Sequence, residues 1–384
     1  MADDASPADG GDAADVLGVD SDGAGTEDGA VESSEGFDRV TVADGDRIVV
    51  EGTVLRGRAF EPIEGRVVIE DGEIVAVEET RTDSDAIVCP AFVNAHTHVG
   101  DSIAKEAGEG LDLDELVAPP DGLKHRLLRA ADTEELVAAM RRSLRAMVAG
   151  GTAAHVEFRE GGLDGVREYR LAAGGVPIDP VLLGRETEEA MRAADGFGAS
   201  GARDGSFGRL RNATHEAGKL FGIHAGERDP HDVNPALDLD PDFLVHMVHP
   251  ERVHLERLDD DAIPVVVCPR SNLVTRVGVP PIRELAERTT VALGTDNVML
   301  NSPSMFREME FANKLADVPA AEVLRMATVN GADLAGLNCG LIEEGRDGKL
   351  LVLDGDSDNL GGARDVVRAV VRRAGERDVD RVVL

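Results

Sequence analysis

The alternation of short strand-like runs with helical runs between Cys89 and Leu337 is the feature that most constrains the fold. Such alternation is typical of βα units arranged around a parallel sheet. Roughly 250 residues of it match a (β/α)8 barrel, whose active site lies at the C-terminal ends of the strands. We therefore predict an α/β protein with a TIM barrel over residues 90–337.

Several barrel elements can be placed from periodicity and capping residues. A helix is expected over 133–148, with Thr133 as its N-cap, and another over 209–220. The apolar run at 180–184 is taken as the fourth strand. The other strands are expected at 152–158, 222–225, 243–246, 264–268 and 291–296.

The two ends of the chain have a different character from its centre. Residues 1–38 are acidic and small, which predicts a disordered acidic tail. From residue 39 to 89, short β-rich runs include Asp71-Gly72 between two alternating apolar segments, a strong hairpin signal. Because 348–354 reads similarly, we expect residues 39–89 and 338–384 to form one small β-sandwich domain.

The net charge of −34 and the presence of only five lysines indicate a surface adapted to high salt, as in a halophile, since screening weakens self-repulsion. Such a surface repels phosphates, so neither nucleic acid nor an anionic membrane is an expected partner. Three widely spaced cysteines favour free thiols and a cytoplasmic location. The sequence contains neither a membrane-length apolar run nor a signal-peptide pattern.

Histidines near the start of the barrel region suggest a metal site. His96 and His98 end an apolar run that reads as a buried strand, and residues two apart on a strand point the same way. Two neutral imidazoles are half of a four-coordinate site. Further candidates end later strands: His224, Glu227, His246 with His249, and Asp296. Singly each has a structural explanation, but together they favour a metal site at one barrel face.

At these motifs the chain resembles the amidohydrolase superfamily, specifically its branch of cytosine deaminases, S-adenosylhomocysteine deaminases and triazine chlorohydrolases. The matching segments lie between residues 39 and 355. They are Pro90-Ala-Phe-Val-Asn-Ala-His-Thr-His98, His224-Ala-Gly-Glu227, His246-Met-Val-His249, Pro269-Arg-Ser-Asn272 and Leu293-Gly-Thr-Asp296.

The resemblance implies a role for each of these residues. His96, His98, His224 and Asp296 would bind one divalent metal, expected to be zinc, with iron as the alternative. Glu227 would shuttle protons, and His246 would face the attacking water and the substrate. Asp296 would also act as a base. His249 is expected to be structural, and members of this branch are often homo-oligomers.

Three features bear on metal number and substrate. Binuclear relatives need a modified lysine on the fourth strand, and the absence of lysine from the expected strand ends favours one metal. Val267 and Asn297 stand where many relatives carry histidine and glycine, so the substrate does not transfer from a relative. The residues expected to contact substrate are Arg159, Glu160, Ser271, Asn272 and Asn297.

These observations predict a metal-dependent hydrolase acting on C–N bonds other than peptide bonds. Its expected reaction is deamination of a small heterocycle, namely a purine, pterin, pyrimidine or related cyclic amidine. A metal ion such as zinc lowers the pKa of bound water from about 15.7 towards 7, and Glu227 could receive the released proton. The alternatives are hydrolysis of a cyclic amide or halogenated heterocycle, or an inactive barrel that serves as a binding protein.

Overall fold

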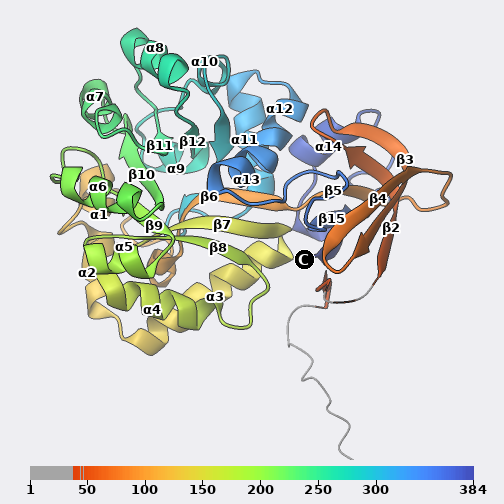
Figure 1. Cartoon of the computed structure of the whole chain (residues 1–384), viewed down its shortest axis with the longest axis horizontal. Helices are drawn as coiled ribbons and strands as arrows, with labels where there is room; N and C mark the ends of the chain where they lie inside the picture. The colour runs from red at the N-terminus through yellow and green to blue at the C-terminus, as the bar shows by residue number, and fades with distance from the viewer. Residues whose placement is uncertain (1–37, 44, 46) are drawn as a thin grey trace, which may run out of the picture. The chain divides into compact units, whose positions relative to one another are not determined.

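A parallel sheet of nine strands forms the centre of the computed structural model, which describes residues 38–43, 45 and 47–384 (Figure 1). In spatial order the strands are β13 (Val291–Leu293), β12 (Val265–Val267), β11 (Phe243–His246), β10 (Leu220–Ala225), β9 (Gly196–Ala199), β8 (Asp179–Gly184), β7 (Thr152–Arg159), β6 (Phe92–His98) and β14 (Asp296–Asn297). Only Gly294 and Thr295 separate β13 from β14, yet these strands lie at opposite ends of the order. The sheet therefore curls on itself, which confirms a TIM-like barrel.

The seam where the barrel closes is short. Strand β14 pairs with β6 through two residue pairs, Asp296 with Thr97 and Asn297 with His98. Just before β14, a Cβ added to Gly294 would lie 2.6 Å from the Cβ of His96 and 2.8 Å from its backbone nitrogen. A larger residue at position 294 would therefore push the seam apart beside a candidate metal ligand.

One barrel strand was missed in the sequence, and the strand count changes as a result. The expected strand at 180–184 is β8, which is the third barrel strand rather than the fourth. The fourth is β9, which has the sequence Gly-Phe-Gly-Ala. A four-residue segment with two glycines gives no periodic signal. No lysine ends β9 in the described structure, so the reason for expecting a single metal is unchanged.

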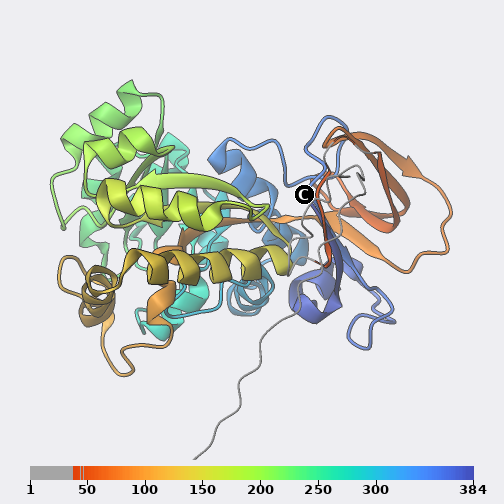
Figure 2. The same cartoon turned by 90° about the horizontal axis from the view of Figure 1, so that it is seen from below.

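Helices on the outside of the barrel follow the strands, with two corrections to the expected ends. Helix α3 (Thr133–Ala149) is capped by Asp132, whose side chain accepts a hydrogen bond from the backbone nitrogen of Glu135, so Thr133 is not the N-cap. Helix α6 (Gly208–Glu216) ends earlier than predicted, because Leu220 already begins β10. Viewed from below, α3 and α4 (Gly162–Ala173) lie side by side (Figure 2).

The remaining barrel helices are no longer than α4, and several are only one or two turns long. They are α5 (Glu188–Ala193), α7 (Val233–Leu237), α8 (Arg252–Asp261), α9 (Pro269–Val274), α10 (Ile282–Ala286), α11 (Met305–Ala316), α12 (Ala320–Met326) and α13 (Val329–Ala335). A 3-10 turn (Pro230–Asp232) precedes α7.

A long loop joins β6 to α3 and begins directly after His98. It contains a 3-10 turn (Val99–Ala104), α1 (Leu113–Val117) and α2 (Leu123–Ala130). Ala104 and Leu116 of this loop pack against Met299 and Leu300, which follow β14. The loop that follows the first barrel strand is thus anchored on the segment that follows the last.

Strands from both ends of the chain build a second sheet, with seven strands in the described residues (Figure 1). In spatial order they are β1 (Val40–Thr41), β16 (Val379–Val383), β15 (Leu350–Leu353), β5 (Ile87–Pro90), β2 (Ile48–Arg56), β3 (Glu61–Glu70) and β4 (Glu73–Glu79). Asp71 and Gly72 form the expected hairpin turn, both with positive φ. Helix α14 (Val366–Arg372) and a 3-10 turn (Glu376–Asp378) precede β16.

These strands form one continuous sheet, so the expected β-sandwich and the division at residues 89/90 and 337/338 stay predictions. The acidic tail expected over residues 1–38 lies, up to residue 37, outside the described residues. Within the described residues, none of the helices is both long enough and apolar enough to cross a membrane.

Candidate active site

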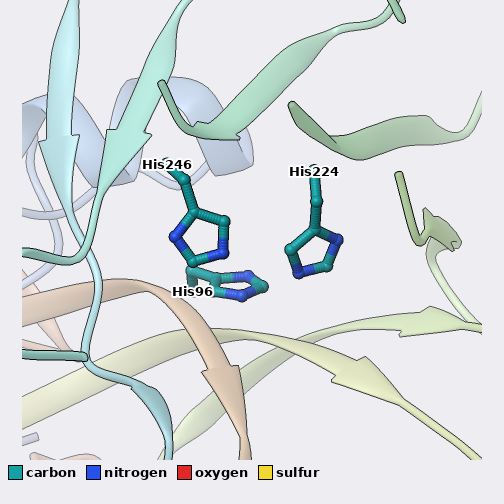
Figure 3. Close-up of side chains that lie close together, drawn as sticks. All are labelled: His96, His224 and His246. Atoms are coloured by element: carbon teal, nitrogen blue, oxygen red, sulfur yellow. The ribbon is translucent and has the colours of Figure 1, made fainter. Parts of the chain in front are cut away.

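Six side chains that the sequence suggested for chemistry converge at the C-terminal ends of barrel strands. The rings of His96, His224 and His246 turn towards a common point (Figure 3). Groups of three among the six have ligand atoms within 4.8 Å of one another. The six are His96 and His98 of β6, His224 of β10, Glu227 just after β10, His246 of β11 and Asp296 of β14.

Two of the histidines are held with one ring nitrogen facing inward. His98 donates from Nδ1 to the carbonyl of Phe158 at 3.0 Å, and His224 donates from Nδ1 to the carbonyl of Ala199 at 2.8 Å. Each ring therefore keeps an unprotonated Nε2, and the two Nε2 atoms lie 3.4 Å apart. Burial lowers the pKa of His98 to about 3 and that of His224 well below its usual value, which keeps both rings neutral and able to bind a metal.

His96 supports the same interpretation. The ring is fully buried, and neither of its nitrogens has a hydrogen-bond partner among the described residues. Its Nε2 lies 3.3 Å from Oδ1 of Asp296, and His98 Nε2 lies 3.6 Å from the same oxygen. Because unpaired buried polar groups are costly, this set of two imidazoles and a carboxylate fits a divalent metal ion.

Asp296 is held in place by its neighbours and by its backbone. Ser271 Oγ donates to Oδ2 at 2.5 Å, and Asn297 Nδ2 donates to Oδ1 at 2.9 Å. Burial acts to raise the pKa of Asp296, but the adjacent ring of His96 and the other nearby imidazoles hold it well below its usual range. Asp296 has φ of 58° and His246 has φ of 80°, a left-handed conformation that is uncommon outside glycine and often found at functional sites.

Glu227 and His246 form a second pair beside the cluster. Asn272 Nδ2 donates to Glu227 Oε1 at 3.3 Å and to His246 Nδ1 at 3.1 Å. The proton of His246 is thereby left on Nε2, which lies 3.5 Å from Glu227 Oε2. Burial raises the pKa of Glu227 above its usual value, so its pKa and that of Asp296 move in opposite directions. Two carboxylates with separated pKa values are typical of a proton acceptor beside a permanently ionised group.

The residues expected to contact substrate fall into different places. Ser271 and Asn272 are fully buried and contact Asp296, Glu227 and His246. Arg159 donates to the carbonyl of Gly165 and to Glu168, and it lines a cavity beside the cluster. Contact of any of them with substrate stays a prediction.

Glu160 contacts one of the candidate metal ligands directly. Its Oε1 lies 2.8 Å from His98 Nδ1 and also accepts hydrogen bonds from Lys124 at 2.8 Å and Arg185 at 2.9 Å. Burial acts to raise the pKa of Glu160, but Lys124, His98 and Arg185 hold it well below the usual range. The sequence placed neither cation in the site, because both lie outside the matching motifs and their partners are distant along the chain.

The strand that carries two of the histidines is also braced from outside the barrel. Thr97 donates to Glu157 Oε2 at 2.7 Å, and Glu157 accepts from the backbone nitrogen of Val99 at 2.9 Å. His155 contacts Thr97 at 2.9 Å and Tyr169 at 2.6 Å, so it is a core residue. Burial raises the pKa of Glu157 to about 8.

Two adjoining cavities open at the site. A small one of about 90 Å³ is lined by His98, His224, Glu227 and Lys124 among others. A larger one of about 520 Å³ lies next to it and is lined both by apolar residues such as Phe197 and Phe207 and by charged ones such as Arg159 and Glu160. The residues common to both linings are Pro119, Arg185, Ser200 and Asp204. A ligand could therefore place one group at the cluster and extend into the larger cavity.

Comparison with known proteins gives a consistent result. The sequence model of the amidohydrolase family matches residues 87–384. A putative aminohydrolase of Methanothermobacter thermautotrophicus is 38% identical over 351 residues, covering 80% of this chain and 91% of that protein. The 5-methylthioadenosine/S-adenosylhomocysteine deaminase of Halobacterium salinarum is 28% identical over 398 residues, covering 89% of this chain and 90% of that protein.

A solved structure shares the fold. An adenosine deaminase from Xanthomonas campestris with bound zinc matches with a TM-score of 0.69 and 20% sequence identity. The match covers 89% of this chain and 93% of that chain.

Proposed function

Because the chain belongs to the amidohydrolase family and is a hydrolase acting on C–N bonds, we propose that it deaminates a small heterocycle with one bound divalent metal ion. The expected substrate is a purine, pterin, pyrimidine or related cyclic amidine. The observation that carries the proposal is the convergence of four imidazoles and two carboxylates of opposite pKa shift at one end of the barrel. A metal-free binding protein would have no need of such a donor set.

The metal would be held by His96, His98, His224 and Asp296, with zinc as the expected ion. Three neutral imidazoles and one carboxylate would leave a divalent ion with a net positive charge, which can polarise a water molecule. A bound zinc ion lowers the pKa of a coordinated water from about 15.7 towards 7. We retain one ion per chain, because no lysine ends a barrel strand in the described structure.

The protein's own side chains would then manage the proton. Glu227 has a raised pKa, so it can accept the proton that the attacking water loses and return it to the ring or to the leaving amine. His246 would hold the substrate with its Nε2 proton, since Asn272 fixes the tautomer. Asp296 stays ionised and serves as ligand and secondary base.

The paired cavities bear on substrate size. The small cavity at the cluster would take the reacting ring edge, and the adjoining cavity of about 520 Å³ would take a substituent. Adenosine derivatives with a 5′ substituent should therefore be tested first in a substrate screen. Both compounds in the name of the Halobacterium salinarum relative, 5-methylthioadenosine and S-adenosylhomocysteine, are of this kind.

Metal analysis followed by an ammonia-release screen over a heterocycle library tests the proposal. We expect about one divalent ion per chain and ammonia release from at least one cyclic amidine. Release of chloride, or ring opening without ammonia, would instead favour a chlorohydrolase or cyclic amidase. Binding of heterocycles with no turnover by the metal-loaded protein would refute an enzymatic role.

A further inference from the structure

We propose that Lys124 is a positioning residue that holds two of the candidate metal ligands from outside the coordination shell. The inference rests on the proposed function only in assuming that the cluster binds a metal. Lys124 lies on α2, in the long loop between β6 and α3, and not on a barrel strand.

Two hydrogen bonds of the Lys124 ammonium carry the inference. One reaches Oε1 of Glu160 at 2.8 Å, and the same oxygen lies 2.8 Å from Nδ1 of His98. The other reaches Oδ1 of Asn297 at 3.2 Å, and Nδ2 of Asn297 donates to Oδ1 of Asp296 at 2.9 Å. A single ammonium is thus connected to His98 on one side and to Asp296 on the other, each through one intermediate side chain.

The burial of Lys124 shows that these contacts are built into the fold. Its side chain is 3% exposed, and a buried ammonium is costly unless it is paired and hydrogen-bonded. The carboxylate of Glu160 supplies the opposite charge, and Arg185 contacts the same oxygen. A lysine that served only solubility would lie at the surface, as Lys105 does in the same loop.

The expected effect on the metal follows from ligand orientation. Glu160 and the carbonyl of Phe158 both face Nδ1 of His98, which fixes the ring with Nε2 towards the cluster. Groups that orient metal ligands in this way typically contribute 10- to 100-fold to metal affinity or activity. Without Lys124 both connections lose their common donor, so His98 and Asp296 should hold the ion less firmly.

Lys124 also lines the small cavity, so direct contact with substrate is the rival explanation. The two explanations differ in what they change. A positioning residue affects the metal in the absence of substrate, whereas a substrate contact changes KM and leaves the metal alone.

The experiment compares the cobalt-loaded wild type with K124M, K124R and the loop control K105M. The measurements are the rate of cobalt transfer to a chelator and the visible absorption spectrum of the bound cobalt, both without substrate. We expect metal release about 10- to 100-fold faster in K124M with a changed spectrum. K124R, which keeps the charge, should be intermediate, and K105M should match the wild type.

A second variant keeps the inference testable if K124M folds poorly. Glu160→Gln preserves the size of the side chain and should also make metal release faster than in the wild type, as K124M does. The combined K124R/E160Q variant, which does not require K124M to fold, should release metal more slowly than the product of the two single effects predicts, because the residues share one connection. Wild-type release and spectrum in K124M, or independent effects of the two changes, would overturn the inference. A wild type that takes up no metal would refute the proposed function itself.

Discussion

Replacement of Glu227 by glutamine separates proton transfer from metal binding. Glutamine has the size of glutamate but cannot accept the proton lost by water. Its amide oxygen can still accept the hydrogen bond that Asn272 Nδ2 gives to Glu227 Oε1 at 3.3 Å, so the side chain should stay in place. The variant should therefore fold and keep its metal while it loses the acid–base group.

The size of the loss can be bounded from the neighbouring groups. A positioned acid–base group contributes about 10² to 10⁴ in rate, which is about 3 to 5 kcal/mol at about 1.4 kcal/mol per tenfold. Asp296 is the alternative carboxylate in the same cluster, but its pKa lies well below the usual range, whereas burial raises that of Glu227. Asp296 should therefore replace Glu227 poorly, and kcat should fall at least a hundredfold.

The assay is ammonia release at saturating substrate, with metal content measured on the same samples. His224→Ala is the matched control, because its Nε2 faces the cluster and its loss should remove both metal and activity. If Glu227→Gln released its metal, Glu227 would be a ligand and the proposed shell would be wrong. If it stayed nearly as fast as the wild type, the proton would have to leave through Asp296 or His246.

Three further predictions concern the metal, the surface and the core. His96→Ala and Asp296→Ala should each lose the single ion and the activity; two ions per wild-type chain in elemental analysis would contradict the proposed stoichiometry. The melting temperature should rise between low and molar KCl, because salt screens a net charge of −34, and a flat profile would rule out adaptation to salt. Burial raises the pKa of Glu157 from 4.5 to about 8, so the folded state binds its proton more tightly than the unfolded state does. The wild type should therefore lose stability relative to Glu157→Gln as pH rises from about 5 to 8; a difference in unfolding free energy that does not change with pH would show that the pKa is ordinary.

The parts of the fold that could be predicted are those with local signals. The alternation of apolar runs and helical spacing predicted the barrel, and Asp71-Gly72 predicted the hairpin between β3 and β4. Strand β9 could not be found, because its glycines carry neither side-chain periodicity nor β propensity. The N-cap of α3 was misplaced by one residue, since both Asp132 and Thr133 are good capping residues and only the geometry decides between them.

The site divides in the same way. The histidines, Glu227 and Asp296 could be proposed because each ends an apolar run in a recognisable motif. Lys124 and Arg185 meet Glu160 only after the chain has folded, across 36 and 25 residues respectively. The Lys124 contact depends on the path of the loop between β6 and α3, for which the sequence holds no periodic signal. The Arg185 contact depends on the register in which β8 pairs with β7.

In the described structure, the seam between β14 and β6 is one of three joins between barrel strands that consist of only two residue pairs, the others being β8 with β9 and β11 with β12. It is therefore one of the places where the barrel should open. Local opening begins where few contacts hold two elements together, and amide exchange reports it directly. His96 and His98 stand on one side of this seam and Asp296 on the other, so an ion bound by all three would fasten the joint. Adding metal should then slow exchange at residues 96–98 and 296–297 far more than where β8 pairs with β9, a join that is equally short but carries no residue of the candidate metal groups in the described structure. The ion would thus stabilise the closed barrel in addition to its role in the reaction.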